Sequence, residues 1–371
     1  MGRGELAESV CAWLWEITQR RYELDGHYIA KLERGVVRWP SAVYRSGLRH
    51  VLNVATDAEL GFAPGGRELA VQGDAEPAGT PDLPATLMNA AGESARFLSL
   101  AESSNVGELT VDQIHVDVRR VAHSYLKVPT LPLFSQTCTL RDRAFTLLEG
   151  RQPPSRTREL YAAAGWALTM LAWMSVDLGR PDTAEDHARA AWACAVNADH
   201  DGLRGWVRAT QHTAAFWQGD YTRAATYAAD GLRYATGTGR TFLTSAYALD
   251  LARDGQPQPA QAALAQARDA ADSAEPDDEI GGPFTCSRDR AASLWSDTHL
   301  ALGEPDDALR LAADAVAMFE ATPADQRNLG SERMTRIQVV KAHLQRRELD
   351  GAAEALAPVL ATPPEHRVRP L

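Results

Sequence analysis

The stretch KLERGVVRWP, residues 31–40, gathers three basic side chains within ten positions. Lys31, Arg34 and Arg38 follow one another at intervals of three and four residues, so they lie near one face of a short helix and its end. Arginine and lysine bind phosphate oxygens, and lysine also donates to guanine edges. The stretch is therefore suited to contact DNA, and the plainer alternative is the solvated basic end of an ordinary helix.

The charge of the whole chain makes this basic stretch unusual. The formal net charge is −11, yet residues 20–50 carry seven Lys or Arg against three Asp or Glu. Residues 63–371 carry 30 basic and 41 acidic residues. A polyanion is therefore expected to meet the N-terminal part of the chain and not the remainder.

Short helices must hold these side chains. Asp25 and Ser41 are suitable N-caps, and Gly35 is a suitable C-cap. Two short helices joined by a turn, the second with polar and basic side chains, meet the requirements of a helix-turn-helix unit. Apolar periodicity predicts helices over residues 5–18, 25–34, 41–52 and 57–60.

The sequence holds no recognisable catalytic motif. The patterns G-x-x-x-x-G-K-[ST], H-E-x-x-H and G-x-S-x-G do not occur. The run Asp199-His200-Asp201 is the nearest approach to a metal cluster, but it falls in a predicted turn, where capping and surface hydrogen bonds explain it. We expect no enzyme, no cofactor and no metal site.

Composition narrows the class of protein further. At 371 residues the chain is long enough for two or three domains or one extended array. No apolar stretch approaches the ~20 residues of a membrane helix, and the N-terminus lacks the apolar region of a signal peptide. We therefore expect a cytoplasmic protein with no membrane partner and with reduced thiols. The four cysteines lie far apart, at Cys11, Cys138, Cys194 and Cys286.

A Gly- and Pro-rich segment, residues 63–84, predicts a linker without a helix of its own. It separates a head, residues 1–62, from a body, residues 85–371. Residues 85–150 have helical patterns but lack the repeat signature of the later part.

The body contains a repeated turn signature. Each copy begins with Gly, carries Ala at its sixth position and has Ala or Leu at its tenth. The separations of 40, 36, 48 and 44 residues indicate a loose period. The copies are GRPDTAEDHA from Gly179, GDYTRAATYA from Gly219, GQPQPAQAAL from Gly255, GEPDDALRLA from Gly303 and a degenerate RELDGAAEAL from Arg347.

The physical meaning of this signature is a stack of helix pairs. Glycine ends one helix at positive φ, Pro or Asp suits the first turn of the next, and alanine at positions i and i+4 allows close helix packing. A period near 34–45 residues is typical of an α-solenoid such as the tetratricopeptide repeat (TPR). We predict an all-α fold with essentially no β-sheet, and we expect EPDDEIGGP, residues 275–283, to be an acidic surface loop between repeats.

The head and body together resemble a known family. ELAESV, IAKLERGVVRWP, YRSGLRHVL and ATDAELGF resemble the XRE/Cro-type helix-turn-helix regulators of actinomycetes, whose recognition helix commonly ends in an E-R-G-like motif. The body is similar to the TPR-type domain that often follows in such regulators. The resemblance implies that residues 25–34 form the helix that reads the major groove.

This resemblance also implies individual roles. His27, Tyr28 and Lys31 are expected to contact bases or the groove, and Arg34 and Arg38 to contact phosphates. Two departures from the family pattern stand out. Such domains usually begin with a helix of the L-R-x-x-R type, and we expect this helix to be missing from the head. The segment WEITQRRYEL is also longer than a minimal turn.

The body is expected to bind its ligand on the concave face of the solenoid, the usual binding surface of such arrays. Most of the tryptophans there are expected to be inter-repeat core, because aromatic side chains bury large areas. Helical phase gives the following expected groove residues: Trp166, Trp206, Arg208, His212 and Tyr247.

The sequence therefore predicts a homodimeric transcriptional regulator that binds operator DNA. Its repeat body would bind a peptide, a small molecule or a partner protein and change the spacing of two heads. In the similar peptide-sensing regulators of Gram-positive bacteria the groove takes a short peptide. The alternative is a TPR-like protein-interaction scaffold whose head does not bind DNA.

Overall fold

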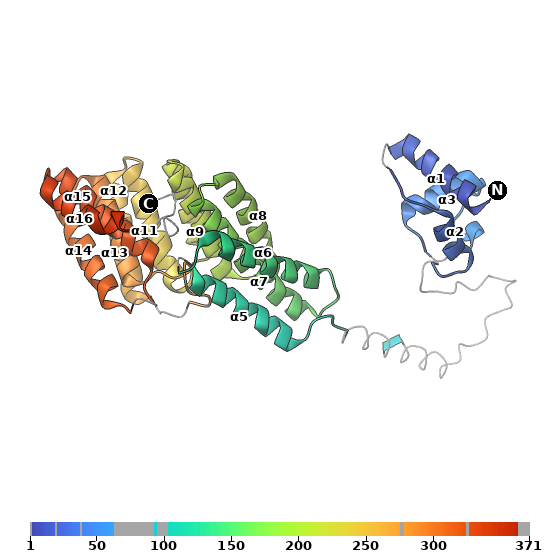
Figure 1. The fold of residues 1–371 in the computed structure, drawn as a ribbon, viewed down its shortest axis with the longest axis horizontal. Helices are drawn as coiled ribbons and strands as arrows, with labels where there is room; N and C mark the ends of the chain where they lie inside the picture. Colours follow the sequence, from blue (N-terminus) through green and yellow to red (C-terminus); the bar gives the residue numbers. More distant parts are fainter. Residues whose placement is uncertain are drawn as a thin grey trace, which may run out of the picture. The chain divides into compact units, whose positions relative to one another are not determined.

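The chain divides into two compact units, Met1–Met88 and Asn89–Leu371. Both are drawn in Figure 1. The predicted linker, residues 63–84, lies outside the described residues. The computed structural model describes residues 2–18, 21–37, 39–62, 93–94, 103–125, 127–274, 278–323 and 326–362.

Regular structure in the described residues is helical throughout, which confirms the all-α prediction. It consists of fifteen α-helices and one 3-10 helix. The nearest approach to a sheet in this part of the chain is an isolated bridge between Gly281 and Phe284. Within the same residues, every helix is too short or too polar to cross a membrane.

The head is built from α1 (Arg3–Thr18), α2 (Gly26–Glu33), α3 (Ala42–Leu52) and η1 (Ala58–Leu60). Both predicted N-caps are confirmed. The Asp25 carboxylate accepts from the Tyr28 N–H at 2.7 Å, and the Ser41 hydroxyl accepts from the Tyr44 N–H at 3.4 Å. Gly35 directly follows the C-cap residue of α2, Arg34. Its φ of 68° is the left-handed conformation expected of a glycine that ends a helix.

One small core holds the head together. Val10 and Leu14 of α1, Ile29 of α2 and Leu48 of α3 are buried in it. Helix α3 approaches α1 closely because it presents Gly47 there, where a Cβ would lie 2.7 Å from a Val10 methyl group. Any larger side chain at this position would require the Val10 side chain or the helices to shift.

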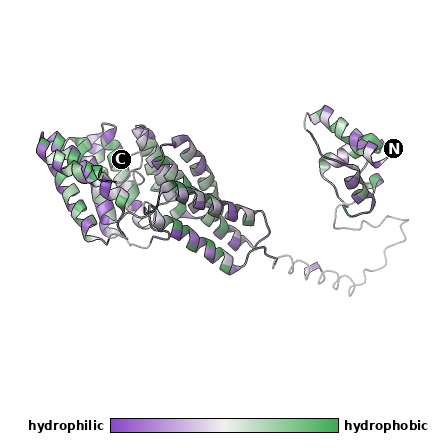
Figure 2. Ribbon diagram, viewed as in Figure 1, coloured by the Kyte–Doolittle hydropathy of each residue, from purple (hydrophilic) through white to green (hydrophobic). Residues whose placement is uncertain are grey.

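The body is a stack of helix pairs, which follow one another from α5 to α16 along its length (Figure 1). Hydrophobic and hydrophilic positions alternate along these helices, as packing on one face requires (Figure 2). The helices are α5 (Glu108–Ser124), α6 (Thr130–Leu148), α7 (Pro154–Asp177), α8 (Pro181–Ala198), α9 (Asp201–Trp217), α10 (Tyr221–Gly231), α11 (Gly237–Arg253), α12 (Pro257–Ser273), α13 (Arg288–Leu302), α14 (Pro305–Ala321), α15 (Leu329–Gln345) and α16 (Leu349–Leu360).

The repeated turn signature has the geometry that its residues predict. All five turns adopt positive φ at the first position, including the degenerate copy, where Arg347 has φ of 63°. The alanine at the sixth position is buried in each copy, so each second helix lies close against its partner. These alanines are Ala184, Ala224, Ala260, Ala308 and Ala352.

Arg347 carries a strain that glycine would remove. We expect Arg347→Gly to raise the free energy of unfolding by about 1 kcal/mol, because a left-handed conformation costs a non-glycine residue about 1–2 kcal/mol and glycine loses part of that gain in the unfolded chain. Urea unfolding followed by circular dichroism measures the change. The matched control is Gly303→Ala, which should shift stability in the opposite direction; a lower stability for Arg347→Gly would contradict the account.

The expectation of an acidic surface loop at residues 275–283 holds for Glu279, which is exposed, and is wrong for Ile280 and Pro283. Ile280 is buried, and so are Phe284 and Cys286 just beyond it. The chain turns inward here because these apolar side chains fill the space between the first helices of the pairs. The ring of Phe284 lies 5.1 to 6.3 Å, between centroids, from three indole rings, those of Trp166, Trp173 and Trp206.

Candidate functional site

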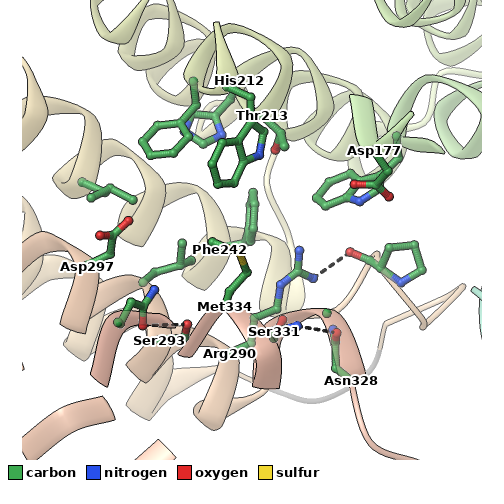
Figure 3. Close-up of a pocket in the computed structure, with 18 of the residues that line it drawn as sticks. Asp177, His212, Thr213, Phe242, Arg290, Ser293, Asp297, Asn328, Ser331 and Met334 are labelled. Atoms are coloured by element: carbon green, nitrogen blue, oxygen red, sulfur yellow. Dashed lines mark hydrogen bonds between the residues drawn. The ribbon is translucent and has the colours of Figure 1, made fainter. Parts of the chain in front are cut away.

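A pocket of about 160 Å³ opens within the body beside a buried arginine, Arg290 (Figure 3). Its walls come from the end of α7, from α9, α11 and α13, and from the first turns of α15. The lining includes aromatic, charged and polar side chains. Among them are Trp173, Asp177, His212, Phe216, Trp217, Phe242, Arg290, Asp297, Asn328, Ser331 and Met334.

Aromatic rings form the apolar wall of this pocket. Trp173 comes from α7, Phe216 and Trp217 from the end of α9, and Phe242 from α11. Trp217 is 43% exposed, whereas Trp173 and Phe242 are buried in the body core. Because they come from successive helix pairs, these rings can lie together only when the solenoid is stacked.

Arg290 is the buried cation of the pocket. Its side chain is on the first turn of α13 and is 7% exposed. One guanidinium nitrogen donates to the Pro283 carbonyl at 2.7 Å and to the Thr285 carbonyl at 2.5 Å. The guanidinium carbon lies 4.6 Å from the Phe242 ring centroid and 5.4 Å from that of Trp173. Burial lowers the pKa of Arg290 from its usual value, yet arginine remains charged in proteins.

Asp177 faces the pocket from the last position of α7. The Tyr125 hydroxyl donates to its carboxylate. Burial raises the pKa of Asp177 to about 7, although the Tyr125 hydrogen bond and the Arg290 charge act in the opposite direction. A carboxylate at a helix C-terminus also faces the negative end of the helix dipole. Burial therefore favours the protonated form of Asp177 in the folded chain.

Two further ionisable groups of the pocket, His212 and Asp297, each contact an ionisable partner. His212 Nε2 lies 3.1 Å from the Asp250 carboxylate, and burial raises the pKa of Asp250. Asp297 accepts from Arg253 at 2.7 Å. The remaining His212 nitrogen, Nδ1, is buried without a hydrogen-bond partner in the part of the chain that the structure describes.

The five residues predicted to line the groove do not all lie at this pocket. Of the five, His212 lines it. Trp166 and Trp206 lie in the core around Phe284. Arg208 donates to Asp230 at 2.6 Å, its guanidinium lies 3.8 Å from the Trp192 ring centroid, and Tyr247 packs against the body core.

Sequence reasoning did not single out Arg290, Asp177 or Phe242. Arg290 stands two residues from Arg288 in the run SRDRAAS, and both occupy the first turn of α13. Arg288 is exposed and pairs with Asp272 at 2.9 Å. Apolar neighbours around Arg290 would have been a signal, but they come from other helices and leave no trace in the local sequence.

In the head, α2 presents a strip of basic side chains away from its core. His27, Lys31 and Arg34 recur at intervals of four and three residues, whereas Ile29 and Leu32 face the head core. His27 and Arg34 are exposed and Lys31 is half-buried. Among the described residues, none of the three forms an ion pair; Arg34 donates to the Ala30 carbonyl of its own helix at 3.1 Å.

Two further DNA contacts were predicted, Tyr28 and Arg38. Tyr28 packs on the head core with its ring 5.6 Å from that of Tyr44, between centroids. Arg38 is outside the described residues. By contrast with the α2 strip, Arg45 and Arg49 of α3 both pair with Asp57, which holds η1 against α3.

At one repeat turn, three side chains of metal-ligating types lie close together. They are His299, Glu304 and Asp307. His299 Nδ1 lies 2.5 Å from the Glu304 carboxylate, and the Arg268 guanidinium lies 3.2 Å from the other ring nitrogen. A guanidinium beside the imidazole opposes a bound cation, so these contacts fit a structural turn. At the Asp199-His200-Asp201 run, His200 caps α9 by accepting from the Leu203 N–H at 3.1 Å, which confirms its capping role.

Comparison of the chain with protein-family models, with curated proteins and with solved structures gives no significant match. The function is therefore inferred from the α2 strip of the head and from the pocket of the body.

Proposed function

We propose that the chain is a DNA-binding transcriptional regulator whose body binds an effector in the pocket beside Arg290. The head contacts duplex DNA through α2, and the chain acts as a homodimer, so that two heads meet two half-sites of an operator. The observation that carries the proposal is the α2 strip, His27, Lys31 and Arg34, which faces away from the head core without ion pairs among the described residues.

The basic side chains of the α2 strip and the fixed position of the helix that carries them support DNA binding by α2. A helix with three basic side chains on its outward face can enter the major groove and contact phosphates beside it. Asp25 caps the N-terminus of α2 and Ile29 anchors its inner face, so the outward side chains start from a fixed backbone. The sequence resemblance to XRE/Cro-type regulators points to the same helix.

The pocket supports the effector part of the proposal. A ligand shifts an equilibrium only when it binds two states with different affinities. Side chains of α7, α9, α11, α13 and α15 meet around the pocket, so a ligand there contacts successive repeats. It would therefore favour one stacking of the repeats over another, and through that stacking the spacing of the two heads.

Loss of strip residues should weaken DNA binding in two different ways. We expect Arg34→Ala to weaken binding to all sequences alike and to reduce the salt slope by about one unit, because it removes a phosphate contact. Lys31→Ala should also lower the preference for the specific duplex, where a base contact discriminates by about 1–3 kcal/mol. Fluorescence anisotropy at several salt concentrations measures both, with promoter duplexes from neighbouring genes and scrambled duplexes.

A matched control for charge is Lys127→Ala, which removes one exposed cation from the body. It should leave the affinity and the salt slope unchanged. If Lys31→Ala and Arg34→Ala bind every duplex as the parent does, the DNA-binding proposal is wrong and the scaffold alternative is favoured.

A further inference from the structure

We propose that the pocket beside Arg290 binds a small organic acid, with its carboxylate on Arg290 and an apolar or aromatic group against the rings of α7, α9 and α11. Small organic acids are thus the ligand class that we assign to the effector site. Its regulatory meaning rests on the proposed function, whereas its binding step does not.

Arg290 supplies the anion-binding charge. It is 7% exposed, and its guanidinium donates to two backbone carbonyls through a single nitrogen. Among the described residues it has no ion-pair partner. A guanidinium has five N–H donors in a planar fork that matches a carboxylate, so a ligand acid would supply both the countercharge and the missing acceptors. Burying a charge with no carboxylate within ion-pair distance is costly, and a bound acid would relieve that cost.

The first turn of α15 faces the same space. Asn328, Gly330 and Ser331 line the pocket, and the Asn328 side chain caps the helix by accepting from the Ser331 N–H at 3.0 Å. The positive end of a helix dipole favours an anion nearby. Figure 3 places Arg290 next to Ser331 and Asn328, so the buried charge and the helix end lie on one side of the pocket.

The other ionisable groups around the pocket each have one polar partner, although His212 keeps Nδ1 without one among the described residues. Asp177 accepts from Tyr125, Asp297 accepts from Arg253, and His212 lies 3.1 Å from the Asp250 carboxylate. Arg290 is therefore the cation with donors left for a ligand among the described lining residues, whereas burial favours the uncharged form of Asp177, a lining carboxyl without an ion pair there. This arrangement favours an acid over an amine.

Size and lining set the rest of the ligand. The volume of about 160 Å³ is close to the ~150 Å³ of a cavity that binds one benzene molecule. Trp173, Phe216, Trp217 and Phe242 offer ring faces and edges, and Met334 adds a deformable thioether. The pocket therefore fits one ring or a short aliphatic chain next to a carboxylate.

Binding can be measured on the full chain without DNA. Phenylacetate is the probe, with its neutral amide phenylacetamide and the cation 2-phenylethylamine as isosteric comparisons. Quenching of tryptophan fluorescence is expected on binding, since Trp173 and Trp217 line the pocket, and isothermal titration gives the stoichiometry. We expect saturable binding of one phenylacetate per chain, and binding at least about tenfold weaker for the amide and the amine.

Two variants locate the site. Arg290→Gln should weaken phenylacetate binding by at least about tenfold while leaving the weak amide binding unchanged. The matched control is Arg288→Gln, an exposed arginine on the same turn, which should bind as the parent does. Met334→Trp fills the pocket without changing its charge and should abolish binding, so the test remains decisive if Arg290→Gln does not fold.

Several outcomes would overturn the proposal. The first is the absence of saturable phenylacetate binding up to about 10 mM, a concentration above the Kd expected of a weak fragment. The second is equal affinity for the acid and the amide. The third is an unchanged affinity for phenylacetate in Met334→Trp. A chain that binds the acid but no DNA retains this site and loses the proposed function. A chain that binds DNA but no acid retains the proposed function and loses this site.

Discussion

Phe284→Ala is expected to lower the free energy of unfolding of the body by about 3–5 kcal/mol, the range for truncating a fully buried phenylalanine. Phe284 is 1% exposed and lies against the indole rings of Trp166, Trp173 and Trp206. Alanine would leave a cavity at the centre of these rings. It would also release the chain segment before α13, which contributes Pro283 to the pocket wall.

Urea unfolding followed by tryptophan fluorescence measures this loss. The matched control is Phe145→Ala on α6, where the side chain is 38% exposed; a change within about 1 kcal/mol is expected there, as for a surface substitution. If Phe284→Ala costs no more than Phe145→Ala, the segment is not fixed in the core and the inward turn is wrong.

The second large effect depends on pH and concerns Asp177. Its pKa is raised from 3.8 to about 7 in the folded chain, so the folded state binds more protons than the unfolded state between these values. Below about pH 4 this group does not lower the free energy of unfolding. The free energy of unfolding falls as the pH rises from about 4 to about 7, and above about pH 7 the group lowers it no further. The total loss is about 4 kcal/mol, from about 1.4 kcal/mol for each pH unit of the window.

Asp177→Asn removes this titration while keeping an oxygen that can accept from the Tyr125 hydroxyl. We expect the variant to gain stability relative to the parent by about 3 kcal/mol more at pH 8 than at pH 5, measured by urea unfolding at each pH. Tyr125→Phe removes the hydrogen bond that lowers the pKa of Asp177, so it should extend the pH window upward. A gain that is equal at both values of pH would show that Asp177 is ionised in the folded chain throughout this range.

Local rules predicted much of the fold because they depend on neighbours in sequence. Asp25 and Ser41 cap their helices as side chains of that type do. The repeat turns needed only Gly or its substitute at positive φ and alanine four residues apart. Even the degenerate copy follows, since Arg347 takes the conformation that Gly303 takes in the copy before it.

The pocket could not be predicted in the same way, because it depends on contacts between distant segments. Arg288 and Arg290 are equivalent in local sequence, yet one is exposed and the other lies under Trp173 and Phe242. The acidic residues of EPDDEIGGP suggested a surface loop, whereas Ile280 and the adjoining Phe284 draw its end into the core. Burial of a few apolar groups outweighed the average polarity of the segment.

The most direct test of the DNA-binding proposal is selection of bound duplexes from a random-sequence pool by the full chain. The comparison is a triple variant of the α2 strip, His27→Ala with Lys31→Ala and Arg34→Ala, whose melting temperature should match the parent because these side chains face away from the head core. The proposal predicts that the parent enriches a shared sequence and that the triple variant enriches none. An unenriched pool from the parent, or the same enrichment by the triple variant, would contradict it.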